Sequence, residues 1–159
     1  MEASPEPLIV PAGFGMAGQL APQLRAADAA ECQANGRTPE QALDRALRLS
    51  ALSRAIVTPS GDIIALFGFA PIDPETAAPW LLGSDALVTT HRRWFVRHTP
   101  LIVRHGDHLW RRFYNLVDAR NTKHIRWLTW AGFQLLPAVP NGVDALPFHP
   151  FTRTTSCVT

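Results

Sequence analysis

Two short apolar runs joined by a tight turn limit the folds open to this chain more than any other feature. Ala55–Thr58 is rich in β-branched residues, Ser60-Gly61-Asp62 has turn chemistry, and Ile63–Phe69 is apolar and aromatic. Strand, tight turn and strand is the simplest interpretation, and it predicts an antiparallel hairpin. The fold therefore contains a β-sheet.

Helical patterns precede this hairpin. The apolar residues between Gln19 and Asn35 recur at helical spacing, and Asn35-Gly36 is a plausible C-terminal stop. Thr38 has the character of an N-cap and Pro39 suits the first helical position, so a second helix is predicted over 39–52.

Strand and helix signals alternate after the hairpin. Pro100 and Gly106 interrupt the helical spacing of residues 91–112, which favours a kink or two helical pieces. The predicted elements are a Pro/Ala-rich loop over 71–79, a strand over 80–88, the helical stretch 91–112, a strand over 113–117, a helix from Asn121 or Thr122 to Gly132, and one or two edge strands after 133.

This order of elements predicts an α/β or α+β fold with a central mixed sheet. The chain has 159 residues, of which 47% are hydrophobic, enough for one well-buried core. Only 18% are charged, and this low charge together with the high hydrophobic content excludes a disordered or fibrous chain. We expect a flexible N-terminal arm over 1–7, a single domain over 8–151 and a C-terminal tail over 152–159.

Charge and cysteine content exclude several other classes. A net charge of +2 is too small for a general polyanion binder. Cys32 and Cys157 are too far apart and too few to form a disulfide framework. No apolar run approaches the ~20 residues of a membrane span. We expect a soluble protein of a reducing compartment, with no membrane partner.

The segment from Val117 to Phe133 combines a strand end, an Asn turn, one short helix and a Gly-Phe stop. Asn121 can cap the helix, and Gly132 can supply its left-handed end. This segment resembles the acyl-CoA-binding strand–helix element of the GNAT acetyltransferase superfamily, in which Asn closes the strand and Gly-Phe closes the helix eleven residues later. The resemblance implies a GNAT-like central mixed β-sheet flanked by about four helices, with Asn121 among the residues that bind acetyl-CoA.

Two departures from that superfamily lie at its chemical centre. The CoA pyrophosphate there lies on a glycine loop, Gln/Arg-x-x-Gly-x-Gly/Ala, at a helix N-terminus, whereas this chain offers Thr89–Trp94 without a glycine. The usual general acid is a tyrosine seven residues after the Asn, and here that position is Leu128. No catalytic residue is therefore assigned. Arg92 and Arg93 can still bind an anion by charge, and they join Asn121 as the residues predicted to bind CoA if it binds.

Three further blocks are similar to the internal virion protein A family of short-tailed, T7-like phages, a GNAT-like group. These blocks are Trp80–Leu87, Tyr114–Asn121 and Gly142–Phe151. The resemblance implies a non-enzymatic, catalytically degenerate protein that acts by protein contacts in virion assembly or DNA ejection. It implies no cofactor, a location in the virion or host cytoplasm, and portal, tail or internal core proteins as partners.

Two enzymatic alternatives stay open. One is an acetyl-CoA-dependent N-acetyltransferase with an atypical CoA-binding loop. The other is a host-directed modifying enzyme carried by a phage. The missing glycine loop and Leu128 favour the non-enzymatic hypothesis over both.

A basic tract occupies residues 91–112. It contains six arginines and only one acidic residue, Asp107. The arginines are Arg92, Arg93, Arg97, Arg104, Arg111 and Arg112. The functional interpretation is contact with a protein partner or with the phosphates of the DNA backbone. The alternative is a solvated helix face, or arginines that pair with acids of a neighbouring subunit.

Other motifs predict less. The six histidines include no H-E-x-x-H and have no cysteine nearby, so no metal site is expected. Gly13–Gly18 matches G-x-G-x-x-G but lacks an acid on a second strand about 20 residues later, so we interpret it as an entry turn.

Overall fold

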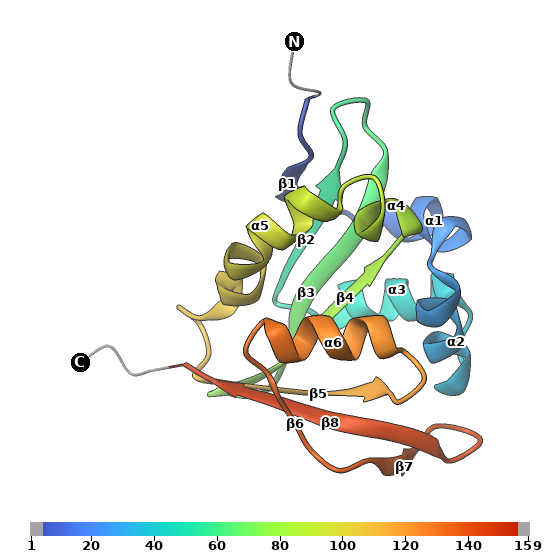
Figure 1. Cartoon of the computed structure of the whole chain (residues 1–159), viewed down its shortest axis with the longest axis vertical. Helices are drawn as coiled ribbons and strands as arrows, with labels where there is room; N and C mark the ends of the chain where they lie inside the picture. The colour runs from blue at the N-terminus through green and yellow to red at the C-terminus, as the bar shows by residue number, and fades with distance from the viewer. Residues whose placement is uncertain (1–4, 156–159) are drawn as a thin grey trace.

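An eight-stranded mixed sheet forms the centre of the protein in a computed structural model that describes residues 5–155 (Figure 1). The strands lie in the order β1-β2-β3-β4-β5-β8-β6, and β7 pairs with β8. Their bounds are β1 Leu8–Pro11, β2 Leu52–Val57, β3 Ile63–Asp73, β4 Thr76–Gly83, β5 Arg112–Asp118, β6 Gln134–Leu135, β7 Val139–Asn141 and β8 Leu146–Thr154. Only β4 and β5 run parallel; the other pairs are antiparallel.

Six α-helices and two 3-10 turns accompany the sheet within residues 5–155, more than the four helices we expected. They are α1 Met16–Leu20, η1 Ala21–Gln23, α2 Ala26–Ala34, α3 Pro39–Leu49, α4 Asp85–Val88, α5 Arg92–Val103, η2 Arg104–Gly106 and α6 Thr122–Trp130. The predicted fold class, mixed α/β with a central sheet, is confirmed. No helix in the described part of the chain is long and apolar enough to cross a bilayer.

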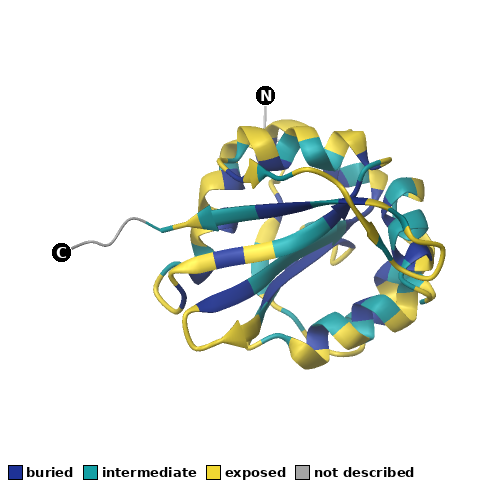
Figure 2. Ribbon diagram, turned by 90° about the horizontal axis from the view of Figure 1, so that it is seen from below, coloured by how far each residue is buried: buried dark blue, intermediate teal, exposed yellow. Residues whose placement is uncertain are grey.

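The helices cover both faces of the sheet. Alternate residues of a strand point to opposite faces, so a strand with apolar residues at successive positions packs against helices on both. Leu66 of β3 packs toward α1 and α3, whereas its neighbour Phe67 packs into the larger cluster with α5 and α6. Figure 2 shows the sheet from below, with the helices exposing their outer faces to solvent. The protein thus has two apolar layers, one on each face of the sheet.

The helix expected over 19–35 is broken into α1, η1 and α2. Pro22 lies in the 3-10 turn and has no N–H to continue an α-helix. Leu24 then takes an extended backbone and bridges to Ser84 beside β4. This break turns α2 toward the ends of β4 and β5.

The start of the second helix is confirmed. Thr38 caps α3, Pro39 is its first residue, and Gln41 completes a capping box with Thr38 at 3.0 and 3.2 Å. The helix ends at Leu49 rather than 52, because Leu52 already belongs to β2.

The hairpin of β2 and β3 is confirmed, but the loop expected over 71–79 is wrong. Strand β3 continues to Asp73 and β4 begins at Thr76, so a second hairpin occupies this segment. The strand expected over 80–88 therefore ends at Gly83, where Ser84 precedes the short helix α4.

The C-terminal half follows the predicted order with one difference. Helix α5 is continuous through Pro100 and passes into η2, so of the two predicted forms, a kink or two helical pieces, the break into two pieces at Pro100 does not occur. Gly132, with φ of 103°, ends α6 as expected, and the Phe133 N–H donates to the Leu128 carbonyl in a Schellman motif. Strand β8 is an interior strand between β5 and β6, where we expected edge strands only.

The expected arm over 1–7 and the expected tail over 152–159 lie partly outside the described residues. Cys157 lies wholly outside them. Within the described part, Glu6 forms an ion pair with Arg97 at 3.0 Å. Strand β8 extends to Thr154, three residues beyond the expected end of the domain.

Candidate functional site

Strands β4 and β5 separate soon after they meet. Only Thr76 with Arg112 and Ala77 with Phe113 are paired. Further on, the Asn115 side-chain amide donates to the Pro79 carbonyl at 2.9 Å. The Pro79 nitrogen lies on the same side of β4 as this carbonyl and has no hydrogen to donate. Proline is tolerated here because β4 has no ladder partner on that side.

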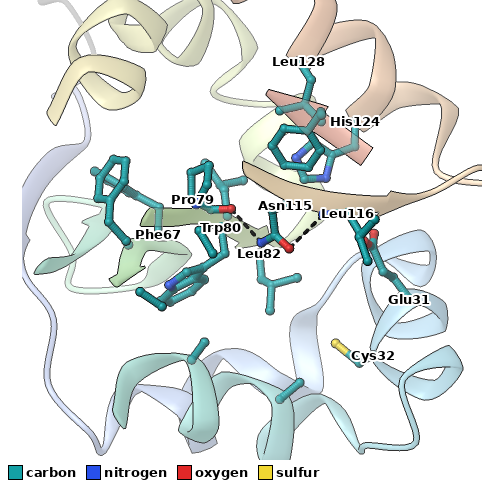
Figure 3. A pocket seen from close by; sticks show the side chains of 18 of the residues that line it. Glu31, Cys32, Phe67, Pro79, Trp80, Leu82, Asn115, Leu116, His124 and Leu128 are labelled. Atoms are coloured by element: carbon teal, nitrogen blue, oxygen red, sulfur yellow. Dashed lines mark hydrogen bonds between the residues drawn. The ribbon is translucent and has the colours of Figure 1, made fainter. Parts of the chain in front are cut away.

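A cavity of about 350 Å³ lies where the two strands separate (Figure 3). Its walls include Glu31 and Cys32 of α2, Trp80 of β4, Asn115 of β5 and Leu128 of α6. Since these elements come from both helical layers, the cavity extends from one face of the sheet toward the other. A largely apolar cavity with a few convergent polar groups is the usual form of a small-molecule site.

A network of buried polar side chains ties α2 to the ends of β4 and β5. Asp28 is 1% exposed and accepts from the Gly83 N–H at 3.1 Å, from Asn121 at 3.0 Å and from Arg25 at 3.2 Å. Glu31 accepts from Asn121 at 3.1 Å. Every buried carboxylate oxygen of Asp28 thus has a donor, as burial of a charge requires.

Glu31 is the titratable group at the cavity whose pKa is tuned toward neutrality. Burial raises its pKa from 4.5 to about 7, against the lowering effect of hydrogen bonds from Asn121 and from the Asp118 N–H; the charges of Asp28 and Asp118 raise it further. A carboxyl group with a pKa near 7 in a cavity suits a general base. Burial also raises the pKa of Cys32 to about 12, so its thiol stays protonated and is a poor nucleophile.

The raised pKa of Glu31 predicts a pH-dependent stability. Between pH 4.5 and 7 the folded chain holds a proton on Glu31 that the unfolded chain has lost, so the free energy of unfolding falls as pH rises. The difference amounts to about 3 kcal/mol. Urea titrations at pH 4.5 and pH 8 should show a smaller fall for Glu31→Gln than for the wild type. The exposed Glu40→Gln is the control, and equal pH dependence of Glu31→Gln and wild type would contradict the prediction.

Asp28, Glu31 and His124 form a group that sequence spacing did not indicate. One ligand-type atom of each lies within 4.8 Å of the other two. The Asn121 amide already donates to both carboxylates, and Arg25 holds a positive charge against Asp28. These groups satisfy the carboxylates without an ion, so we assign no metal to the cluster.

The three residues predicted to bind CoA differ in exposure. Arg92 and Arg93 are exposed at the start of α5. Asn121 is 1% exposed, and its side chain is engaged with Asp28, Glu31 and Arg25. The amide of Asn121 therefore serves the internal network in this conformation.

The space between α5 and α6 is filled by side chains. The rings of Phe95 and Trp127 stack with centroids 5.1 Å apart, and the Trp127 indole N–H donates to buried Thr99 at 2.9 Å. A cavity of only about 30 Å³ remains beside them. Leu128, at the position of the family's general acid, is 3% exposed and carries no polar atom in its side chain.

All six arginines of the basic tract are exposed; they lie on α5, on η2, at Arg111 just before β5, and at the first residue of β5. Arg97 pairs with Glu6 and Arg112 with Glu75. Asp107, the acid within the tract, pairs with Arg153 of β8 instead. Contact of these arginines with a partner or with DNA stays a prediction.

Sequence reasoning missed Asp28, Glu31, Asn115 and His124. Two signals could have indicated the site. The carboxyls of Asp28 and Glu31 are three residues apart in a helical pattern, so they share one face of the helix. Pro79 has no N–H to donate, so a strand that contains it must lack a hydrogen-bonded neighbour on that side.

No family model matches the chain, and no curated protein matches it. Solved structures of acetyltransferases share its fold. Ard1 from Thermoplasma volcanium matches with a TM-score of 0.70 at 13% identity, covering 94% of this chain and 98% of that one. A GCN5-related N-acetyltransferase from Kribbella flavida matches with 0.64 at 18% identity, covering 94% and 98%.

A third match is a GNAT phosphinothricin acetyltransferase from Sinorhizobium meliloti, in complex with AcCoA, with a TM-score of 0.65 at 12% identity, covering 94% and 89%. At such identities the likenesses show the fold alone. They do not bear on the resemblance to phage internal virion proteins, which stays a prediction.

Proposed function

We propose, from the premise that this chain has the GNAT acetyltransferase fold, that it is an acyl-CoA-dependent N-acyltransferase with an atypical acyl-CoA site. The observation that carries the proposal is the cavity at the separation of β4 and β5, with the Glu31 carboxyl, of pKa about 7, in its wall. This favours the enzymatic alternative over the non-enzymatic hypothesis that the sequence suggested.

The chemistry follows from the groups at this cavity. The ammonium group of an acceptor loses a proton to the Glu31 carboxylate, directly or through one water. The amine nitrogen then attacks the acyl carbonyl of the thioester, the N–C bond forms, the C–S bond breaks, and the nitrogen gives its second proton to water as the amide forms. CoA leaves as a thiolate and takes its proton from water, because Leu128 has none to give.

The fit of acyl-CoA to this chain is partial. Arg92 and Arg93 supply charge for the pyrophosphate at the N-terminus of α5, and the loop before them has no glycine to allow close backbone approach. The stacked rings of Phe95 and Trp127 fill the space between α5 and α6. An acyl-CoA arm that runs from Arg92 toward Leu128 requires these rings to separate, so we expect weak binding.

Calorimetry with acetyl-CoA, followed by an assay of thiol release with a mixture of amines, tests the proposal. We expect a Kd between about 10 μM and 1 mM, weakened about tenfold in the double variant Arg92→Ala/Arg93→Ala, because each lost arginine removes a charge-assisted contact. Arg104→Ala, an exposed arginine on η2, is the matched control. No binding heat at millimolar acetyl-CoA would overturn the enzymatic proposal.

A non-catalytic role is the second candidate, and specific observations favour it. Leu128 replaces the acid, Asn121 is engaged inside the protein, and Phe95 with Trp127 fills the space between the helices. On this proposal the chain is a virion-associated protein of a short-tailed phage that contacts portal, tail or internal core proteins, or the DNA backbone, through its arginines. The triple variant Arg92→Ala/Arg93→Ala/Arg97→Ala should then reduce incorporation into particles, and normal incorporation would count against it.

A further inference from the structure

One wall of the large cavity is a single face of α3. Ala42, Arg45, Ala46 and Leu49 line it and recur at the spacing of one helical face. Arg37, in the turn before α3, lines the same cavity. Two arginines therefore line the cavity on the side of α3.

These two arginines hold no carboxylate in the part of the chain that the structure describes. Within residues 5–155, Arg45 has neither an ion pair nor a side-chain hydrogen bond, and the Arg37 side chain donates only to the Asn35 carbonyl, at 3.4 Å. Arg48, one turn along the same helix, is paired with Asp44 at 2.9 Å. The arginine that is paired, Arg48, does not line the cavity, whereas Arg37 and Arg45, which have no carboxylate partner among the described residues, do.

The cationic and carboxyl groups of the cavity are separate. Neither Arg37 nor Arg45 bonds to Glu31, whose carboxyl accepts from the Asn121 amide at 3.1 Å and from the Asp118 N–H at 3.3 Å. The cavity thus offers a proton acceptor in one part and two cations in another. A ligand that satisfies both carries an ammonium group and an anionic group in one molecule.

The remaining wall is apolar. Leu49 is 52% exposed at the edge of the cavity, and Trp80, Leu81 and Leu82 of β4 line its interior. The Trp80 indole N–H is already bonded to Ser50 at 2.7 Å, so this ring presents carbon surface to the cavity. An apolar side chain of a ligand would bury against Leu49 and β4.

We infer that the acceptor is a free amino acid with a large apolar side chain, held by its carboxylate at Arg37 and Arg45 while its amino group faces Glu31. The inference rests on the proposed acyltransferase function and names its acceptor class. Arginine suits the carboxylate because its fork of N–H donors matches the two oxygens. The apolar wall then selects leucine- or phenylalanine-like side chains over charged ones.

Binding of L-phenylalanine, measured by calorimetry beside 2-phenylethylamine, tests the inference without any turnover. The two ligands differ in the carboxylate alone, so we expect L-phenylalanine to bind at least about tenfold more tightly. Arg45→Ala and Arg37→Ala should each remove most of that preference, and Arg48→Ala should retain it. Equal affinity for the two ligands, or no binding of L-phenylalanine, would overturn the inference.

Thiol release from acetyl-CoA separates failure of this inference from failure of the proposed function. If L-phenylalanine binds through Arg37 and Arg45 but no thiol is released, the amino-acid site stands and the acyltransferase proposal fails. If thiol is released equally with amines that lack a carboxylate, the acyltransferase proposal stands and the acceptor class is wrong.

Discussion

Replacing Asp28 by alanine is expected to lower the free energy of unfolding by about 3 to 5 kcal/mol. The carboxylate of Asp28 is the common acceptor for the Gly83 N–H, the Asn121 amide and the Arg25 guanidinium. Without it the Gly83 N–H loses its acceptor and the Arg25 guanidinium loses its counter-charge, although Asn121 still donates to Glu31. The cost of the unpaired charge adds to that of the lost hydrogen bonds. Urea titration at pH 7 measures the change.

Asp44→Ala is the matched control for that experiment. Asp44 forms the exposed ion pair of α3 with Arg48, and such pairs contribute about 0.5 kcal/mol or less. A loss below about 1 kcal/mol for Asp28→Ala would show that the network between α2, β4 and α6 is not an important source of stability.

Replacing Glu31 by glutamine is expected to reduce kcat/KM for acyl transfer by about a hundredfold, the usual contribution of a general base. Wild-type activity should rise with pH and level off above the pKa of about 7, because only the carboxylate accepts the amine proton. The activity of Glu31→Gln should lack this inflection. Both are measured as thiol release from acetyl-CoA across pH 5.5 to 9.

Loss of folding does not account for this result, because Glu31→Gln removes the cost of ionising a buried carboxyl at pH 8. A protein that becomes slower without becoming less stable indicates a chemical role for Glu31. A pH profile of Glu31→Gln that keeps the wild-type inflection would exclude Glu31 as the base.

The sequence correctly predicted helix ends and a hairpin turn, because capping and turn residues determine these features locally. Thr38 with Gln41 set the start of α3, and Gly132 set the end of α6. The hairpin at Gly61 followed from turn residues next to β-branched ones. Each of these depends on residues within a few positions of one another, so the sequence alone contained the information.

The predictions that were based on prolines, or that overlooked one, were wrong where tertiary contacts decide whether a proline fits a strand or a helix. Pro71 and Pro79 suggested a loop, yet both lie in strands of a hairpin. Pro79 is tolerated because β4 has already separated from β5 there, which no local pattern reveals. Pro22 had the opposite effect, since it breaks a segment that otherwise has helical periodicity.

The candidate site depends on contacts that are distant in the sequence. Asp28 and Asn121 are 93 residues apart, and Glu31 and Asp118 are 87 apart. Asn121 was correctly placed at the start of a helix, but its use inside the protein depends on α2. The pKa of Glu31 likewise follows from burial that only the folded chain creates.

The short strands at the two sides of the sheet have a consequence for self-association. Strand β1 has four residues and ends in Pro11, and β7 has three residues with Pro140 at its centre. Proline removes a backbone donor, so neither edge offers a long row of free N–H groups on which a second copy could extend the sheet. Assembly with other molecules would then use the helical faces, where the arginines of α5 lie, rather than strand addition.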